Sequence, residues 1–235
     1  MRIVVAAAGQ GTRMQELTKE TPKHLLPVLG KPFLFYLLEN IKQAGFEEVI
    51  VIGGYKIEQL ENFLKSYDPE IVLVNQNKHI IDGSYGSAIP VLCARYHVLE
   101  ESFILISGDN LYSVTDLKKF REFTDSYVHV AGLSHENPER YGVLQAEGDF
   151  LKTIIEKPVA PAGNLINTGL YLLTKEIFPA IGKIKISSRG ELELTDALNI
   201  MAKSKKVKVE KLADYWYDFG RPEDIKKIEN FLNEH

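Results

Sequence analysis

Short apolar runs alternate with amphipathic segments along the first half of this chain. The runs are typical of buried strands, and apolar residues that recur every three to four positions are typical of helices. The predicted strands are residues 3–8, 49–52, 71–74 and 103–106, and the predicted helices are residues 33–44, 57–64 and 88–98. This alternation indicates an α/β fold whose mostly parallel sheet is covered by helices on both faces, with ligands at the carboxyl ends of the strands.

The second half has more strands, and some of them follow one another through short turns. The predicted strands are residues 128–133, 143–146, 151–156, 166–173 and 207–212, and the predicted helices are residues 175–181, 195–202 and 222–232. Gly148 and Asp149 form a predicted turn between two of these strands. Because no linker rich in Pro, Gly or Ser divides the chain, we expect residues 1–235 to form a single domain with two halves that meet near residue 125.

The composition is that of an ordinary globular protein, with 45% hydrophobic and 26% charged residues. A formal net charge of −4 does not favour nucleic-acid binding, and no apolar run is long enough to span a membrane. The single cysteine, Cys93, excludes an internal disulfide and is expected to pack in a helix. We therefore predict a cytoplasmic protein that binds neither nucleic acid nor membranes, and the composition is compatible with a homo-oligomer.

The loop after the first strand carries the most informative chemistry. Gly9 and Gly11 allow a backbone to approach an anion and to offer it N–H groups. Arg13 adds a rigid fork of donors, and Lys23 adds a mobile positive charge. These residues predict a loop that holds a triphosphate, although Met14 stands where a dinucleotide fingerprint needs a third glycine, and the P-loop pattern is absent as well.

Residues 9–32 resemble the signature of the sugar-nucleotidyltransferases, the NDP-sugar pyrophosphorylases, and in particular the glucose-1-phosphate thymidylyl- and uridylyltransferases. The matching residues are Gly9, Gly11, Thr12, Arg13, Leu17, Thr18, Pro22, Lys23, Leu25, Leu26, Pro27, Val28, Lys31 and Pro32. Glu16 replaces the proline that usually precedes Leu-Thr. The resemblance implies the Rossmann-like mixed sheet of the nucleotide-diphospho-sugar transferase fold, with a nucleotide-binding half of about residues 1–125 and an acceptor-binding half of about residues 126–235.

The resemblance assigns catalytic roles to Arg13 and Lys23. It assigns nucleotide binding to Ala8, Gly9, Gly11, Thr12, Gln76, Gly86 and Ser87. The stretch from Gln76 to Ser87 departs from the family, because its gap is longer and Ser87 replaces a threonine. That gap and the neighbouring residues 77–79 are similar to the phosphocholine-type cytidylyltransferases, so the identity of the base stays open.

Two aspartates and a group of polar residues complete the predicted site. Asp109 and Asp218 match the two metal-binding aspartates of the family, and Mg²⁺ takes one or two carboxylates together with substrate phosphates. The residues that match acceptor contacts are Gly142, Glu156, Lys157, Asn167 and Thr168. Residues 188–196 resemble a further family segment, which we interpret as architecture with Thr195 capping a helix.

The predicted reaction is in-line attack of a sugar 1-phosphate on the α-phosphate of an NTP, UTP or dTTP, which expels pyrophosphate. The nucleophile is already anionic, so catalysis requires positioning and charge neutralisation rather than a general base. Two alternatives remain. One is a CTP-dependent cytidylyltransferase that acts on phosphocholine or another phospho-alcohol. The other is a non-catalytic sensor of nucleotide sugars, which would be expected to lack Arg13, Lys23 or an aspartate.

Overall fold

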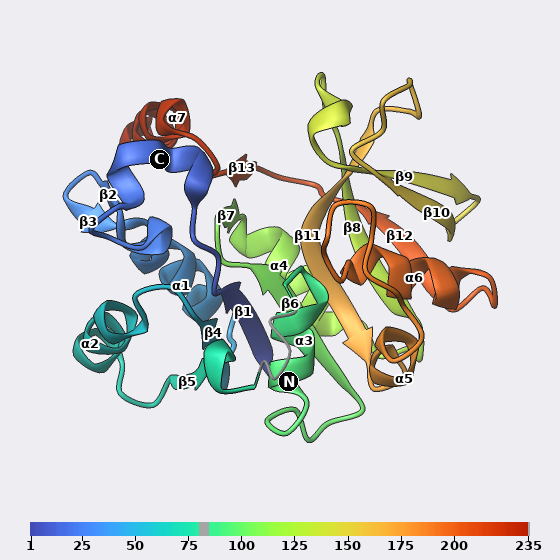
Figure 1. The fold of residues 1–235 in the computed structure, drawn as a ribbon, viewed down its shortest axis with the longest axis horizontal. Helices are drawn as coiled ribbons and strands as arrows, with labels where there is room; N and C mark the ends of the chain where they lie inside the picture. The colour runs from blue at the N-terminus through green and yellow to red at the C-terminus, as the bar shows by residue number, and fades with distance from the viewer. Residues whose placement is uncertain (80–84, 235) are drawn as a thin grey trace.

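A nine-stranded mixed sheet runs through the centre of the molecule, and the computed structural model describes it for residues 1–79 and 85–234 (Figure 1). The strands lie in the order β5 (Val72–Asn75), β4 (Val49–Gly53), β1 (Ile3–Ala7), β6 (Ser102–Ser107), β11 (Leu165–Thr174), β8 (Val128–Ser134), β12 (Val207–Lys211), β10 (Phe150–Glu156) and β9 (Gly142–Glu147). These bounds confirm the strands predicted from the apolar runs to within one or two residues.

Parallel pairing is concentrated in the first half of the chain. Strands β5, β4, β1 and β6 pair in parallel, as do β8 and β12, whereas the pairs that β11 and β10 make are antiparallel. Parallel neighbours need a long crossover, and helices supply it here, whereas β9 and β10 are joined by the predicted turn at Gly148, whose φ is +59°. The predicted mixed α/β sheet is therefore confirmed.

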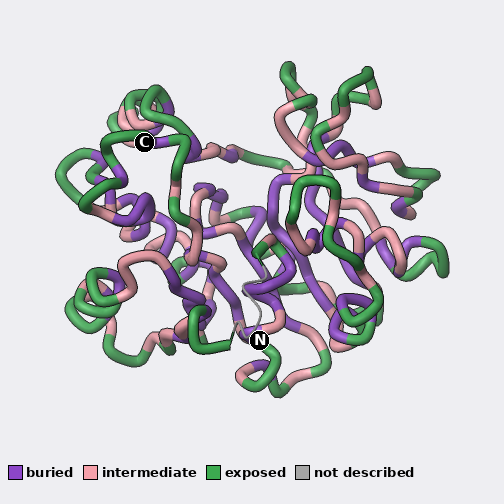
Figure 2. Tube along the Cα trace, viewed as in Figure 1, coloured by how far each residue is buried: buried purple, intermediate pink, exposed green. Residues whose placement is uncertain are grey.

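Helices cover both faces of the sheet, as predicted. One face packs against α1 (Phe33–Gln43), α2 (Ile57–Tyr67) and α4 (Val114–Glu122), and the other packs against α3 (Ala88–Ala94), α5 (Ile177–Ile181) and α6 (Leu194–Ala202). Alternate residues of β1 serve the two faces, since Ile3 and Val5 belong to the first cluster and Val4 to the second. Figure 2 shows the resulting band of buried backbone along the central strands. Cys93 is buried in α3, as expected.

The last segment of the chain returns to the first half. Strand β13 (Trp216–Asp218) pairs antiparallel with β7 (Asn110–Tyr112), and α7 (Pro222–Glu234) then lies beside the N-terminal segments at the upper left of Figure 1. There it packs near the hairpin of β2 (Pro27–Val28) and β3 (Lys31–Pro32). Phe219 stacks on Phe33 with ring centroids 4.2 Å apart. The segment from β13 to α7 therefore lies against the first half although it comes last in the chain. The division into halves near residue 125 stays a prediction.

Two details of the predicted helices are wrong. Helix α3 ends at Ala94, well before residue 98. Thr195 does not cap α6, because the N-cap residue is Glu193 and Thr195 lies within the first turn. The N–H of Leu194 instead donates to the Ser87 hydroxyl at 2.9 Å, so a side chain from a different segment satisfies this end of the helix. No helix in residues 1–79 and 85–234 is both long enough and apolar enough to cross a membrane.

Candidate active site

The glycine loop lies between β1 and the short helix η1 (Thr12–Thr18), at the carboxyl edge of the parallel strands. Gly11 has a φ of +67°, and a Cβ at this position would lie 2.8 Å from the Cβ of Lys23. The Thr18 hydroxyl donates to the Gly11 carbonyl oxygen at 3.1 Å and fixes the loop from the other side. Glycine is therefore needed at position 11 both for its backbone conformation and for the close approach of the segment that carries Lys23.

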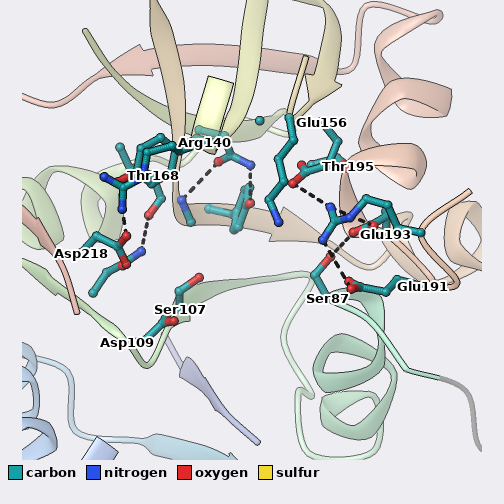
Figure 3. A pocket seen from close by; sticks show the side chains of 18 of the residues that line it. Ser87, Ser107, Asp109, Arg140, Glu156, Thr168, Glu191, Glu193, Thr195 and Asp218 are labelled. Carbon is teal, nitrogen blue, oxygen red and sulfur yellow. Dashed lines mark hydrogen bonds and ion pairs between the residues drawn. The ribbon is translucent and has the colours of Figure 1, made fainter. Parts of the chain in front are cut away.

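Two adjoining cavities open beside this loop. The first, which we call the loop cavity, has a volume of about 540 Å³ and is lined by residues 9–13, Lys23 and Tyr85, among others. The second, the strand cavity, has a volume of about 270 Å³ and is lined by residues of β9, β10, β11 and the segment before α6, among others (Figure 3). Residues that line both cavities are Arg13, Asp109, Lys157, Arg189 and Glu191. Ligands in the two cavities would thus share these five side chains as neighbours.

Lys23 and Asp109 form an ion pair in the loop cavity. Burial alone would raise the pKa of Asp109, but the neighbouring positive charges, first among them the ammonium group of Lys23, together outweigh it and hold that pKa below its ordinary value. Burial also raises the pKa of Asp218, to about 6, and the negative charge of Asp109 acts in the same direction. The two carboxylates are therefore close enough to repel each other, and Lys23 compensates only part of their charge.

The pairing of β13 with β7 brings these aspartates together from distant parts of the chain. Asp218 is opposite Asn110, and the N–H of Phe219 donates to the carbonyl oxygen of Asp109 at 2.8 Å. A Cβ on Gly220 would lie 3.0 Å from a carboxylate oxygen of Asp218, so glycine leaves room for this side chain. Tyr141 donates to the same carboxylate at 3.2 Å.

The donor set fits one magnesium ion bound together with phosphates. The described residues contain no group of three or more His, Cys, Asp or Glu side chains that could hold a metal ion on their own. Mg²⁺ does not require one, because it keeps several waters and takes one or two carboxylates plus substrate phosphates. Asp109 and Asp218 supply those two carboxylates, and the mutual repulsion that raises the pKa of Asp218 is the interaction that a cation would relieve.

All five predicted acceptor residues line the strand cavity. A Cβ on Gly142 would lie 2.9 Å from a carboxylate oxygen of Glu156, so glycine allows this carboxylate to lie over the backbone. Asn167 donates to the Tyr171 hydroxyl at 2.6 Å, and the carbonyl oxygen of Thr168 accepts from the indole of Trp216 at 3.2 Å. Lys157 lines both cavities and forms no ion pair with any residue of the described ranges.

The residues predicted to bind the nucleotide do not all line the same cavity. Gly9, Gly11 and Thr12 line the loop cavity, whereas Ala8 and Gln76 line neither cavity. Gln76 is buried, and its side-chain oxygen has no hydrogen-bond partner among residues 1–79 and 85–234. Between Gln76 and Gly86, residues 80–84 lie outside the described residues, and the exposed residues 77–79 line neither cavity.

Gly86 and Ser87 hold the loop before α6 in place. Gly86 has a φ of +134°, and a Cβ there would lie 2.3 Å from the carbonyl oxygen of Leu192. The N–H of Leu192 donates to the carbonyl oxygen of Tyr85 at 2.7 Å. Ser87 lines the strand cavity and accepts from Leu194. These residues therefore clamp one wall of the strand cavity, and we call residues 85–88 with residues 187–194 the wall clamp.

Sequence reasoning missed an arginine at the centre of this wall. Arg189 forms ion pairs with Glu156 at 3.1 Å, Glu191 at 3.3 Å and Glu193 at 3.2 Å, and it lines both cavities. Burial raises the pKa of Glu193, and the positive charge of Arg189 opposes this shift. The Arg-Gly-Glu-x-Glu spacing was the available signal, but we interpreted it only as architecture. Tyr85, Arg140 and Tyr141 also line the cavities and were not predicted as site residues.

Comparisons with known proteins agree with this geometry. The family model described as nucleotidyl transferase matches residues 2–235. A bifunctional protein GlmU from Methanocaldococcus jannaschii is 38% identical over 234 residues, which are 99% of this chain and 54% of that protein. The UTP–glucose-1-phosphate uridylyltransferase AglF from Haloferax volcanii is 33% identical over 246 residues, which cover 100% of this chain and 97% of AglF. The chain spans about half the length of the first of these relatives.

Solved structures show the same fold. A proposed glucose-1-phosphate thymidylyltransferase from Bacillus anthracis has a TM-score of 0.85 and 26% identity, over 100% of this chain and 96% of that one. A UDP-glucose pyrophosphorylase complexed with UDP-glucose has a TM-score of 0.83 and 27% identity, over 99% of this chain and 98% of that one. These matches confirm the predicted nucleotide-diphospho-sugar transferase fold.

Proposed function

The chain belongs to the nucleotidyl transferase family, and we propose that it joins a nucleoside triphosphate to a sugar 1-phosphate and releases pyrophosphate. The observation that carries this proposal is the shared wall of the loop cavity and the strand cavity. A triphosphate beside the glycine loop and a sugar phosphate beside Glu156 would meet at Arg13, Asp109 and Lys157. That juxtaposition suits the transfer of a nucleotidyl group between the two ligands.

The residues of the loop cavity would hold the triphosphate. The N–H groups of residues 9–12 and the guanidinium of Arg13 are suited to the β- and γ-phosphates, which leave as pyrophosphate. Lys23 is buried beside Asp109, where its ammonium group can neutralise charge at the α-phosphate as the pentacoordinate transition state forms. Fixed positive charges of this kind need no reorganisation during the reaction.

Magnesium would be held by Asp109 and Asp218 together with the phosphates. When bound, the ion would neutralise phosphate charge and orient the phosphates for in-line attack. Lys23 and Arg13 act on the same charges, so the role of the two aspartates is to bring a second source of positive charge to the point where the cavities meet. Tyr141 helps to orient Asp218 through the hydrogen bond to its carboxylate.

The strand cavity would hold the acceptor. Lys157, which lacks an ion-pair partner among the described residues, is suited to the phosphate of the sugar 1-phosphate. Glu156, Asn167 and the backbone of Gly142 and Thr168 are suited to hydroxyl groups, which both donate and accept hydrogen bonds. The attacking phosphate oxygen is anionic, so these residues position it and do not remove a proton.

Gln76 is buried and lines neither cavity, so its contact with the base rests on the family resemblance; on that basis it favours a base that offers an N–H donor. A buried amide oxygen without a partner is unfavourable, and an N–H group from a ligand would satisfy it. Uracil and thymine carry such a group at N3, whereas N3 of cytosine is an acceptor. UTP and dTTP are therefore our proposed nucleotides.

Neither alternative function has a specific structural observation in its favour. Residues 77–79, which suggested a cytidylyltransferase for phosphocholine, are exposed and line neither cavity. The sensor hypothesis expects the loss of a charged site residue, yet Arg13, Lys23 and Asp109 all line the loop cavity. The dependence on Mg²⁺, the cytoplasmic location and the absence of nucleic-acid and membrane partners remain parts of our proposal, and oligomeric state stays open.

A screen for pyrophosphate release tests the proposal. ATP, GTP, CTP, UTP and dTTP are each combined with glucose 1-phosphate, other hexose 1-phosphates and phosphocholine, in the presence of Mg²⁺. We expect release with UTP or dTTP and a hexose 1-phosphate. Release with CTP and phosphocholine alone would instead support the cytidylyltransferase, and no release with any pair would contradict an enzymatic function.

A further inference from the structure

The segment that would hold the triphosphate is anchored by few polar contacts. We call residues 9–20 the loop segment, and only two of its residues, Met14 and Thr18, are buried. Among the residues that the structure describes, every hydrogen bond that other parts of the chain make to the loop segment comes from the side chain of Tyr55 or Gln59. These two residues therefore supply the hydrogen bonds that anchor it.

Tyr55 and Gln59 hold three consecutive carbonyl groups at the end of the loop segment. The Tyr55 hydroxyl donates to the carbonyl oxygens of Thr18, at 3.0 Å, and Lys19, at 3.3 Å. Gln59, one turn further along in α2, donates to the carbonyl oxygen of Glu20 at 2.8 Å. The start of α2 thus fixes the backbone that leaves the loop segment.

The same contacts extend to the glycines at the start of the segment. The Thr18 hydroxyl donates to the carbonyl oxygen of Gly11, as described above, so the two ends of the segment are joined. The backbone N–H of Tyr55 donates to the carbonyl oxygen of Ala8 at 3.3 Å. A Cβ on Gly54 would lie 2.9 Å from that oxygen, so the backbone before Tyr55 packs directly against the start of the segment. Tyr55 therefore contacts the chain at both ends of the loop segment.

Two residues close to these contacts have an unfavourable backbone conformation. Lys56 has a φ of +46°, and Gln15, within the loop segment, has a φ of +53°. Such values are costly for residues other than glycine, and they persist only where surrounding contacts hold the backbone in place. We expect the loop segment to leave this conformation more often when the hydrogen bonds of Tyr55 and Gln59 are removed.

We propose that Tyr55 and Gln59 are positioning residues that hold the loop segment in the conformation that binds the triphosphate. This inference rests on the proposed function. Neither side chain lines the loop cavity or the strand cavity, so both act through the loop segment and not on a ligand. A segment that is already in place loses less conformational freedom when the nucleotide binds, which increases the affinity. The acceptor would be held by other residues and should not depend on these two.

The kinetic test removes the donors without changing the charge. In Tyr55→Phe and in Gln59→Leu, the KM for the nucleotide should rise about three- to tenfold, the scale of one hydrogen bond between neutral groups. The KM for the acceptor and the melting temperature should stay close to those of the wild type. Tyr67→Phe is the matched control, because Tyr67 is also in α2 and its hydroxyl donates to Glu39 at 2.7 Å, but it lines neither cavity.

Two further measurements need no turnover. Amide hydrogen exchange of residues 12–20, followed by mass spectrometry, should be faster in Tyr55→Phe than in the wild type and in Tyr67→Phe. Calorimetric titration with pyrophosphate and Mg²⁺ should show an affinity that is lower by the same three- to tenfold factor. An inactive wild type would contradict the proposed function, whereas exchange and pyrophosphate binding would still decide the role of Tyr55.

Three outcomes would overturn the inference. Equal exchange in Tyr55→Phe and the wild type would show that the hydroxyl does not hold the loop segment. Faster exchange with unchanged nucleotide KM and pyrophosphate affinity would show that the position of the segment does not govern binding. An equal rise of KM for nucleotide and acceptor, or the same rise in Tyr67→Phe, would make the effect a general structural one.

Discussion

The loop cavity and the strand cavity differ in how their lining residues are arranged along the chain. In the loop cavity, the contiguous residues 9–13, two of them glycines, supply a large share of the lining, and the positive φ of Gly11 lies where the segment that carries Lys23 comes close. In the strand cavity, charged side chains from separate segments supply the wall, and Arg189 alone holds three carboxylates. A cavity lined largely by one contiguous segment depends on a sequence motif. A cavity lined by separate segments depends on how those segments pack against one another.

The largest effect is expected where the cavities join, because metal removal acts on both. Treatment with EDTA should lower turnover about 10³-fold, since a bound cation contributes several kcal/mol to a phosphoryl-type transition state. Asp109→Asn and Asp218→Asn should each weaken metal-dependent turnover far more than they change the melting temperature. Asp149→Asn, in an exposed turn, is the control. Full activity in EDTA, or in both site variants, would remove the metal from the proposal.

The next effect separates the loop cavity from its surroundings. Arg13→Ala and Lys23→Ala should each lower kcat about 10²-fold or more while the protein stays folded, because preorganised charges contribute a few kcal/mol to the transition state. Lys19→Ala is a suitable control, since Lys19 is exposed and, among the residues that the structure describes, forms an ion pair only with Glu16. Steady-state kinetics and a thermal melt would be recorded for each variant. Near-normal kcat in either site variant would exclude that residue from the proposed role.

A backbone substitution in the wall clamp tests whether the strand cavity also depends on glycine. Gly86→Ala should lower the free energy of unfolding by about 2–3 kcal/mol, because the new Cβ would collide with the carbonyl of Leu192 at a positive φ. Gly190→Ala is matched, since Gly190 has a φ of +80° in the same clamp but no atom within 4 Å. It should cost about 1 kcal/mol. If urea titrations gave both variants the same loss of unfolding free energy, the close approach of Gly86 to Leu192 would contribute nothing to stability.

The preference for a base is a smaller effect. Pyrimidine triphosphates should be used about tenfold better than ATP or GTP, on the scale of one hydrogen-bond mismatch in a closed site. Among pyrimidines we expect UTP and dTTP to exceed CTP, because the oxygen of Gln76 lacks a partner in the described part of the chain and N3–H can supply one. The value of kcat/KM is measured for each nucleotide at saturating acceptor. The highest value for a purine would contradict the first expectation, and the highest value for CTP the second.

The smallest effect concerns the ion pairs of Asp125, which lies at the boundary between the predicted halves and outside both cavities. Partial burial acts to raise the pKa of Asp125, but hydrogen bonds from His129 and Lys208 outweigh it and lower the pKa to about 2. A depressed carboxylate pKa stabilises the fold above the pKa of the unfolded chain, and this contribution is lost as pH falls from about 4 to about 2. Because Asp125 is more than one third exposed, we expect less than about 1 kcal/mol.

The measurement is urea unfolding of the wild type and Asp125→Asn across this range. The difference in unfolding free energy should be largest at neutral pH and should shrink as the pH approaches 2. A difference that grows on acidification would have the wrong sign and would contradict the assignment.

The same contrast explains what the sequence could predict. Strands and helices with strong periodicity, such as β1 and α1, were found because local burial decides them. The glycine loop was found because its backbone geometry demands particular residues in a fixed order. Strands β7 and β13 were missed because each has only three residues and exists through its pairing with the other.

The remaining errors come from contacts between segments that are far apart in the sequence. Thr195 has the composition of a helix cap, but Ser87 from another segment takes over part of that function. Arg189 was interpreted as architecture because nothing near it in the sequence shows that Glu156 would lie beside it.

The pairing of β13 with β7 also affects when the site can be assembled during synthesis of the chain. A chain is synthesised from its N-terminus, so the glycine loop and Asp109 leave the ribosome long before Asp218 does. Until β13 reaches β7, the carbonyl of Asp109 lacks the N–H of Phe219, and Phe33 lacks the ring on which it stacks. Such a nonlocal contact forms late, because a long loop must close first. The charge arrangement that we propose for catalysis is therefore complete only once β13 has been synthesised and has paired with β7.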